Sequence, residues 1–304
     1  MSNQWAVLIS LPAEKGKQLG TVLESMGLSV HTREWERQTR TEPAGAPVLA
    51  VAPLEDYGHK HTLLSWAQPN VKRPPTALVG SGGLTPEILR FQLLHDILNI
   101  IPESLWDDPP CLERIMRGLL CPEEMFNIRR FVPDATVVEK LTITNLAEKH
   151  QIADEVASLI RVFAGTQHRA HDIRLIINEL INNAFFHSFQ NMEGEEKYTP
   201  RRFAQLDEGD RVSLEVALSE KAIALGVEDN CGTISPREVL KYLLRQTSGE
   251  GVYDSHGRGF YLVSNLADHL SVGVQPGRRT RVTVMNHAGT EGHTRTLNFF
   301  VVGE

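Results

Sequence analysis

The order of apolar segments changes about halfway along the chain, and this change constrains the fold more than any other feature. In the first hundred or so residues, short apolar runs at 6–10, 28–32, 47–53 and 76–81 alternate with helical stretches. Each run is bounded by turn-forming residues, as buried strands are. Strands that alternate with helices in this way predict an α/β fold, with a parallel sheet covered by helices on both faces.

The second half predicts a different arrangement. It begins with a strand at 139–145, and helical patterns follow at 150–164 and 171–190. After the helices, strands are expected at 211–219, 222–229, 270–275 and 280–285, with a glycine-rich loop region before the last two. Runs of helices followed by runs of strands predict a separate α+β sandwich.

These patterns divide the chain into a first domain at 1–125, a linker at 126–138 and a second domain at 139–304. A chain of 304 residues is long enough for two domains that each bury a core. The apolar fraction of 41% and the charged fraction of 23% are typical of a soluble globular protein. A net charge of −7 argues against a nucleic-acid binder that relies on a basic surface.

The cysteines and the hydropathy predict a cytoplasmic protein. The three cysteines are odd in number and include no C-x-x-C pair, so we expect reduced thiols. No apolar run approaches the length of about 18 residues that a membrane span needs. The first residues, MSNQWAVLIS, lack the pattern of a secretory signal. We therefore expect no association with membranes.

A polar stripe on one of the expected helices is the first candidate site. The decamer NELINNAFFH (178–187) places Glu179, Asn183 and His187 at intervals of four, so the three share one narrow face. A carboxylate one turn away from a carboxamide can orient a water molecule and supply an oxygen ligand to Mg²⁺. A surface helix whose polar residues face water would show the same pattern, so the decamer alone does not decide.

Two later segments carry further candidate chemistry. LGVEDN (225–230) ends a strand on Asp229, whose carboxylate can accept a hydrogen bond from an exocyclic amine such as that of adenine. In SHGRGFYLV (255–263), Gly257 and Gly259 precede an apolar helix, and backbone amides at a helix N-terminus suit a triphosphate. Each segment has a simpler explanation, because Asp-Asn pairs often end strands and glycines often serve only a turn.

In this order, the three segments resemble the ATP-binding domain of the GHKL superfamily, which gyrase, histidine kinases and MutL share. The resemblance covers about residues 138–288 and is closest to the anti-sigma factor serine kinases, whose asparagine box the decamer resembles. It implies that Glu179 is the general base and that Asn183 is a ligand of Mg²⁺. The residues that it implies for ATP binding are Asn182, Asn183, His187, Asp229, Gly232, Gly257, Arg258, Gly259 and Thr280.

The loop after Asp229 departs from the family pattern. The family usually has glycines at the second and fourth positions after this aspartate, whereas this chain has Cys231 and Thr233, with Gly232 between them. Side chains at these two positions can crowd the nucleotide or bias the lid over the site.

The first domain resembles, in the order of its elements over about residues 4–125, a response-regulator receiver that has lost its chemistry. A working receiver needs acidic residues after the first strand and an aspartate at the end of the third. Here only Glu14 lies near the first strand, and Ala52 and Pro53 end the third. The resemblance implies a surface for docking or dimerisation, and the alternative is a structural domain without a regulatory role.

Together the resemblances imply a cytosolic regulator that binds Mg·ATP and phosphorylates a serine or threonine of a partner protein. The implied partner is a STAS-type anti-sigma antagonist or a sigma factor, and a homodimer stays open. One alternative is a non-catalytic module in which the nucleotide sets a partner-binding conformation. Another is a histidine kinase that autophosphorylates on His95 in LLHDILN (93–99), although Pro102 and the Pro109-Pro110 pair interrupt the helical hairpin it needs.

Overall fold

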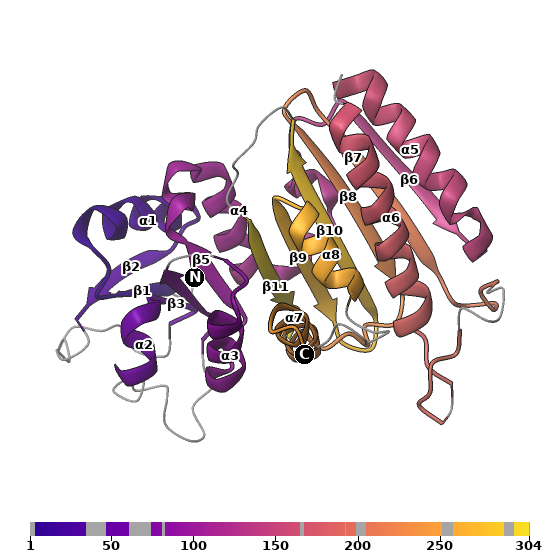
Figure 1. The fold of residues 1–304 in the computed structure, drawn as a ribbon. Coiled ribbons are helices and arrows are strands. Elements are labelled where there is room, and N and C mark those ends of the chain that lie inside the picture. Colours follow the sequence, from indigo (N-terminus) through magenta and orange to yellow (C-terminus); the bar gives the residue numbers. More distant parts are fainter. Residues whose placement is uncertain are drawn as a thin grey trace. The chain divides into compact units, whose positions relative to one another are not determined.

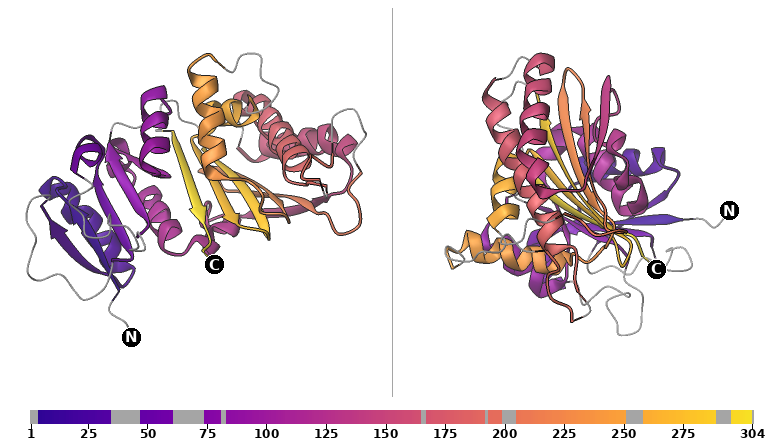
Figure 2. Two further views of the ribbon diagram at one scale, coloured as in Figure 1. Left: turned by 90° about the horizontal axis from the view of Figure 1, so that it is seen from below. Right: turned by 90° about the vertical axis from the view of Figure 1, so that its right-hand side faces the viewer.

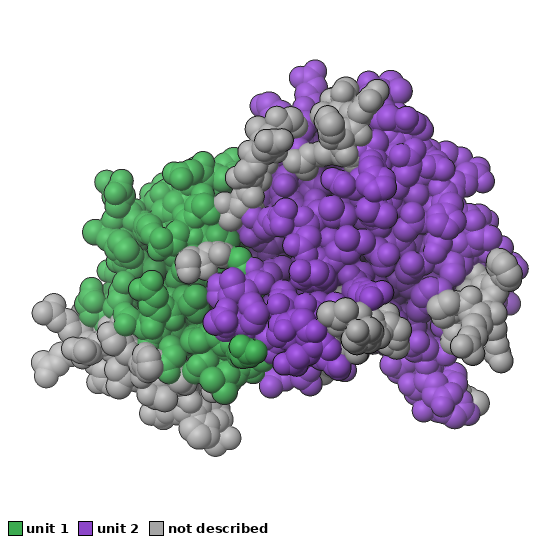
Figure 3. Space-filling view, viewed as in Figure 1, with its two compact units in different colours: residues 1–83, 90–121 green, residues 84–89, 122–304 purple. Residues whose placement is uncertain are grey.

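The chain forms two compact units (Figure 3). Its structure, a computed structural model, describes residues 4–34, 47–60, 74–80, 83–164, 167–191, 193–198, 205–250, 258–288 and 295–303. Unit 1 contains Met1–Gly83 and Arg90–Cys121, and unit 2 contains Leu84–Leu89 and Pro122–Glu304. The segment 126–138, expected to be a linker, belongs to unit 2.

Unit 1 is built on a five-stranded parallel sheet with the strand order β2-β1-β3-β4-β5. The strands are β1 (Trp5–Ile9), β2 (Ser29–Arg33), β3 (Leu49–Pro53), β4 (Thr76–Gly80) and β5 (Asn99–Pro102). This order is that of the flavodoxin-like doubly wound sheets. The predicted parallel sheet is confirmed, and its central strands are buried as their continuous apolar runs require.

Helices cover the sheet of unit 1. They are α1 (Ala13–Ser25), α2 (Leu54–Lys60), α3 (Pro86–His95), the 3₁₀ helix η3 (Glu103–Asp107) and α4 (Pro109–Leu120). Figure 1 shows α1 and α4 on one face of the sheet and α2 on the other. This distribution follows from right-handed crossovers, because the chain moves outward from β1 in opposite directions through α1 and α2.

The Pro109-Pro110 pair, which the sequence suggested as an interruption of a long helical hairpin, lies at the start of a separate helix. Both prolines lie in the first turn of α4, where the missing amides have no partner to lose. Asp108 caps this helix, because its side chain accepts a hydrogen bond from the Cys111 amide at 3.1 Å. The two prolines thus favour α4 rather than breaking it.

Unit 2 contains a mixed six-stranded sheet with the order β11-β9-β10-β8-β7-β6. The strands are β6 (Val137–Ile143), β7 (Val212–Leu218), β8 (Ala222–Asp229), β9 (His269–Gln275), β10 (Arg279–His287) and β11 (Thr296–Val301). β11 pairs in parallel with β9, and all other pairs are antiparallel. The first five of these strands were predicted, whereas β11 was not.

Three helices lie side by side on one face of this sheet, with α6 between α5 and α8 (Figures 1 and 2). The helices that follow β6 are the 3₁₀ helix η6 (Leu146–Glu148), α5 (Lys149–Ala164), α6 (Gln167–His187), α7 (Pro236–Thr247) and α8 (Arg258–Leu266). The sequence predicted α5, α6 and α8 but gave α7 as part of a loop. A mixed sheet with helices on one face is the α+β arrangement expected for this half of the chain.

The other face of the sheet is covered by two short 3₁₀ helices, η4 (Pro122–Phe126) and η5 (Ile128–Arg130). The Arg279 guanidinium lies 3.9 Å from the centre of the Phe126 ring, and the same ring approaches Gly273 of β9. Cation–π contacts of this kind are typical of arginine over an aromatic face. The stretch after unit 1 is therefore part of the core of unit 2.

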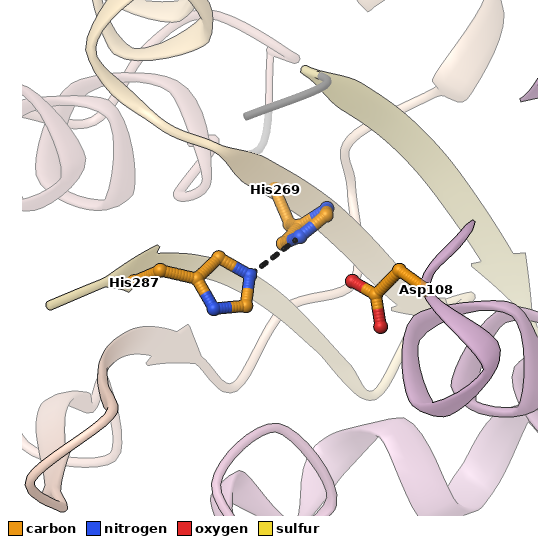
Figure 4. Close-up of side chains that lie close together, drawn as sticks. All are labelled: Asp108, His269 and His287. Carbon is orange, nitrogen blue, oxygen red and sulfur yellow. Dashed lines mark hydrogen bonds between the residues drawn. The ribbon is translucent and has the colours of Figure 1, made fainter. Parts of the chain in front are cut away.

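A chain of polar contacts joins the edge strand β11 to β9 and β10 on this face. The His269 and His287 Nε2 atoms are 3.2 Å apart (Figure 4). His269 Nδ1 lies 2.9 Å from Thr296 Oγ1. The three residues belong to β9, β10 and β11 in turn. Asp108, also drawn in Figure 4, belongs to unit 1.

A buried arginine organises the centre of the same face. Arg281 is 1% exposed, and its guanidinium contacts Glu215 at 2.7 Å and Glu228 at 3.4 Å. Gly226 makes room for it, because a Cβ at that position would overlap the guanidinium. Burial acts to raise the pKa of Glu215, but Arg281 and Lys140 outweigh it and hold that pKa below its usual value.

Neither a membrane-spanning helix nor a disulfide occurs in the described part of the chain. None of the described helices is both long enough and apolar enough to cross a bilayer. The three cysteines, Cys111, Cys121 and Cys231, form no disulfide bond.

Replacing the buried arginine tests how much this network contributes to stability. Arg281→Met should lower the free energy of unfolding by about 3–5 kcal/mol, because it removes the buried cation from Glu228 and leaves Glu215 with Lys140 alone. Urea unfolding followed by circular dichroism measures the change. Arg161→Met on the exposed surface of α5 is the control and should change stability by no more than about 0.5 kcal/mol. Equal stability of both variants would contradict this role of Arg281.

Candidate active site

The polar stripe of α6 meets the start of α8. Gly259, the second residue of α8, lies so close to the stripe that a Cβ there would be 2.8 Å from Glu179 Oε2. The same Cβ would lie 3.0 Å from Asn183 Oδ1. Any other residue at this position would force the side chains of Glu179 and Asn183 to shift. The structure thus brings together two of the segments that the sequence singled out.

Glu179 is half-buried beside a lysine that the sequence did not single out. Burial raises the pKa of its carboxyl above the usual value, and the nearby Lys149 ammonium acts against that rise. Burial in turn lowers the pKa of Lys149, the first residue of α5, while Glu179 acts to raise it. α5 and α6 therefore place an ammonium group and a carboxylate near each other in a partly buried environment.

Asn182 holds this lysine in place. Its side-chain oxygen accepts a hydrogen bond from Lys149 Nζ at 2.8 Å. The resemblance implied that Asn182 binds the nucleotide, whereas its carboxamide here faces α5. No local pattern marks Lys149 as part of the site, because its partners Glu179 and Asn182 are 30 and 33 residues away in the sequence.

Two buried polar atoms near the site have no hydrogen-bond partner among the described residues. They are Asn183 Nδ2 and Thr280 Oγ1, and their residues are 8% and 1% exposed. A buried donor without a partner costs about 1–3 kcal/mol, so such atoms usually mark a site that something else completes. Both are residues that the resemblance implied for ATP binding, and both suit a polar ligand.

Asp229 is buried at the end of β8, where the resemblance placed the adenine-reading carboxylate. Its Oδ2 accepts a hydrogen bond from Ser188 Oγ at 2.8 Å. Its Oδ1 accepts from the amides of Cys231 at 2.9 Å and Gly232 at 3.3 Å. Burial raises the pKa of Asp229, and these donors together with the Thr280 amide act against the rise. The carboxylate is thus already surrounded by donors from the protein itself.

Gly232 shapes the loop that follows Asp229. Its φ of +67° lies in the left-handed region that favours glycine, and its carbonyl accepts from the Gly277 amide at 3.2 Å. A Cβ at Gly232 would overlap the Gln275 carbonyl oxygen. This glycine therefore packs the loop against the β9–β10 turn.

His187, the last residue of the stripe, contacts the segment that follows α6. Its Nδ1 is 2.7 Å from Glu196 Oε1, in the segment that follows α6. Gln190 and Glu196 also form an isolated β-bridge. His187 therefore contacts the chain that leaves α6.

A cavity of about 190 Å³ opens between the end of α6 and the helix α7. Asn183 and His187 line it from α6, Val239 and Tyr242 from α7, and Phe260 from α8. This volume is smaller than the roughly 300–1,000 Å³ of most small-molecule sites. Two residues of the polar stripe, Asn183 and His187, therefore border the cavity.

The loop expected to bind phosphate is described only in part. Gly257 lies outside the described residues. Arg258 is the first residue of α8 and its side chain is exposed. Gly259 is accordingly the residue of this loop that the structure brings to the polar stripe.

His95, the alternative phosphoacceptor, lies at the end of α3 in an α/β unit rather than in a long helical hairpin. α3 has ten residues and is followed directly by β5. The His95 ring stacks on Phe91 with ring centres 4.4 Å apart, and the Tyr57 ring lies edge-on at 6.2 Å. These contacts explain the histidine as a packing residue of unit 1.

The comparison with known families agrees with the geometry of unit 2. The family model described as histidine kinase-like ATPase domain matches residues 143–285. No curated protein matches the chain. The matched segment contains the polar stripe of α6, Asp229 and the start of α8. It supports a GHKL-type ATPase domain in this part of the chain and suggests ATP binding.

The lysine beside Glu179 gives a test that needs no ligand. Lys149→Met should raise the pKa of Glu179, because loss of the cation leaves burial as the main influence on the carboxyl. Lys149→Arg should keep the pKa near the wild-type value. A carbon-13 NMR titration of the Glu179 carboxyl measures both. An unchanged pKa in Lys149→Met would show that the two groups do not interact.

Proposed function

We propose that unit 2 binds Mg·ATP and transfers the γ-phosphoryl group to a serine or threonine of a partner protein. The observation that carries this proposal is the contact of Glu179 and Asn183 with Gly259, which joins the asparagine box to the start of α8. The family match over residues 143–285 supports the nucleotide part of the proposal. The anti-sigma-type kinase activity rests on the resemblance of the decamer.

Glu179 would act as the general base. Its carboxyl has a raised pKa, which makes it a better proton acceptor than an exposed glutamate. In the proposed step, the partner's hydroxyl oxygen bonds to the γ-phosphorus, the bond to the ADP oxygen breaks, and the hydroxyl proton passes to Glu179. Lys149 keeps a positive charge beside this carboxylate, so that the ionised form remains available.

Asn183 would be a ligand of the Mg²⁺ ion that accompanies ATP. Its carboxamide is buried against Gly259 and borders the cavity. Amide oxygens are among the hard ligands that suit Mg²⁺. When bound, Mg²⁺ neutralises charge on the transferred phosphoryl group. Thr280, which pairs with Asp229 across β10 and β8, offers a buried hydroxyl that has no hydrogen-bond partner among the described residues.

Unit 1 would serve as a degenerate receiver that docks a partner or a second copy. Its strand order supports this, and its strand ends carry Ser10, Pro53 and Pro102 where a receiver has its acidic and basic groups. Leu54 fills the space after β3, since a Cβ at Gly80 would lie 2.8 Å from Leu54 Cβ. The proposed partner of the whole chain is a STAS-type anti-sigma antagonist or a sigma factor in the cytoplasm.

A non-catalytic module remains the second candidate, and one observation favours it. The Asp229 carboxylate is filled by protein donors, and the cavity of about 190 Å³ is small for a nucleotide. A domain of this kind would bind nucleotide weakly and use it to set the conformation that grips a partner. Phosphate transfer from labelled ATP to a candidate STAS protein distinguishes the two, because only the kinase labels the partner.

Replacing Glu179 separates binding from chemistry. Glu179→Ala should keep ATP affinity within a few-fold of the wild type but lower phosphoryl transfer by about 10²-fold or more, the usual scale for loss of a general base. Calorimetric titration measures binding, and labelled ATP measures transfer. Equal losses of binding and transfer would mark Glu179 as structural instead.

Replacing Asn183 tests the metal assignment. Asn183→Ala should abolish the part of ATP affinity that depends on Mg²⁺, whereas Asn183→Asp should retain some of it through a carboxylate oxygen. Titrations of ATP with and without Mg²⁺ measure this part. A folded Asn183→Ala protein with unchanged Mg·ATP affinity would show that another group holds the metal.

A further inference from the structure

We infer that Ser188, held in position by Thr233, is a specificity-determining residue that competes with the base amine for the Asp229 carboxylate. This inference rests on the ATP binding proposed above. The inference also gives a role to Thr233, which stands where the GHKL superfamily usually has glycine. It also adds a residue that the sequence did not single out.

The first step is the position of Ser188. It follows α6 directly and is 0% exposed. Its hydroxyl donates to Asp229 Oδ2 at 2.8 Å. Its carbonyl accepts from Thr233 Oγ1, also at 2.8 Å. Ser188 is therefore fixed at both its side chain and its backbone by the loop around Asp229.

The second step is the acceptor capacity of Asp229. An ionised carboxylate offers about four lone-pair positions. Here it receives Ser188 Oγ, the amides of Cys231 and Gly232, and the Thr280 amide. Three of these donors belong to the backbone and cannot leave without moving the loop or the sheet. The Ser188 hydroxyl is the one donor that can turn away by rotation about a single bond.

The third step is the position of Asp229, Ser188 and Thr233 relative to the cavity. Thr233 lines the cavity, whereas Asp229 is 3% exposed and Ser188 is fully buried. An adenine amine that reaches Asp229 Oδ2 therefore competes with the Ser188 hydroxyl, which already donates to this oxygen, and we expect it to replace that hydroxyl. In the wild type this replacement exchanges one hydrogen bond to a carboxylate for another, so the base amine gains little affinity.

Removal of the serine hydroxyl changes this balance. In Ser188→Ala the buried carboxylate lacks one donor, and an adenine amine that supplies it gains a charge-assisted hydrogen bond. Guanine presents a carbonyl at the same position and cannot supply this donor. The predicted result is a change in base selectivity and not a general change in nucleotide affinity.

The experiment measures the affinities of ATP and GTP for the full chain by calorimetry. Ser188→Ala should bind ATP about tenfold or more tightly than the wild type while its GTP affinity stays unchanged. Thr233→Val keeps the volume but removes the hydrogen bond to Ser188, and should give a smaller change in the same direction. Ser219→Ala is the matched control, because Ser219 is also buried and hydrogen-bonded but lies in the β7–β8 hairpin.

The outcomes separate this inference from the proposed function. Equal ATP-to-GTP ratios in the wild type and Ser188→Ala, with ATP bound by both, would overturn the role of Ser188 and leave ATP binding intact. Failure of every variant to bind ATP would overturn both. If Ser188→Ala does not fold, Ser188→Cys keeps a similar volume with a much weaker donor and should show the same shift in selectivity.

Discussion

The buried carboxylate of Asp229 is the constraint on which the site depends. A carboxylate that loses its water must find donors in the protein, and burial here raises its pKa while the donors oppose that rise. The donors come from the end of α6, from the loop after β8 and from β10. One charged group thus ties the C-terminal end of α6 to the sheet, and the orientation of the polar stripe on that helix follows from it.

Three glycines in unit 2 show that the absence of a side chain can serve different purposes. Gly259 lets α8 approach Glu179, Gly232 packs a loop against the β9–β10 turn, and Gly226 leaves space for the buried guanidinium of Arg281. From the sequence, the first two suggested a nucleotide loop. In the structure Gly259 faces the side chains of Glu179 and Asn183, whereas Gly232 faces backbone atoms of the β9–β10 turn, and nucleotide binding by both glycines stays a prediction.

The sequence predicted most elements because their patterns are local, and it missed those whose partners are distant. β1 to β4 and β6 to β10 show apolar runs or alternation, whereas β11 pairs with a strand that begins 27 residues earlier. Ser188 and Lys149 were missed for the same reason, since their partners lie 41 and 33 residues away. A buried hydrogen bond between such segments leaves no periodic trace in the chain.

The two ends of the site are prepared for a ligand to different degrees. At one end Glu179, Asn183 and Gly259 are in contact, and Asn183 Nδ2 is buried without a partner among the described residues. At the other end Thr280 Oγ1 also lacks a partner there, but Asp229 beside it is satisfied by the protein. A ligand therefore gains most binding free energy from hydrogen bonds to Asn183 and Thr280. It gains least from Asp229, whose carboxylate already accepts hydrogen bonds from the protein. The carboxylate that would read the base is the same one that holds the fold together, so stability and recognition compete for its oxygens.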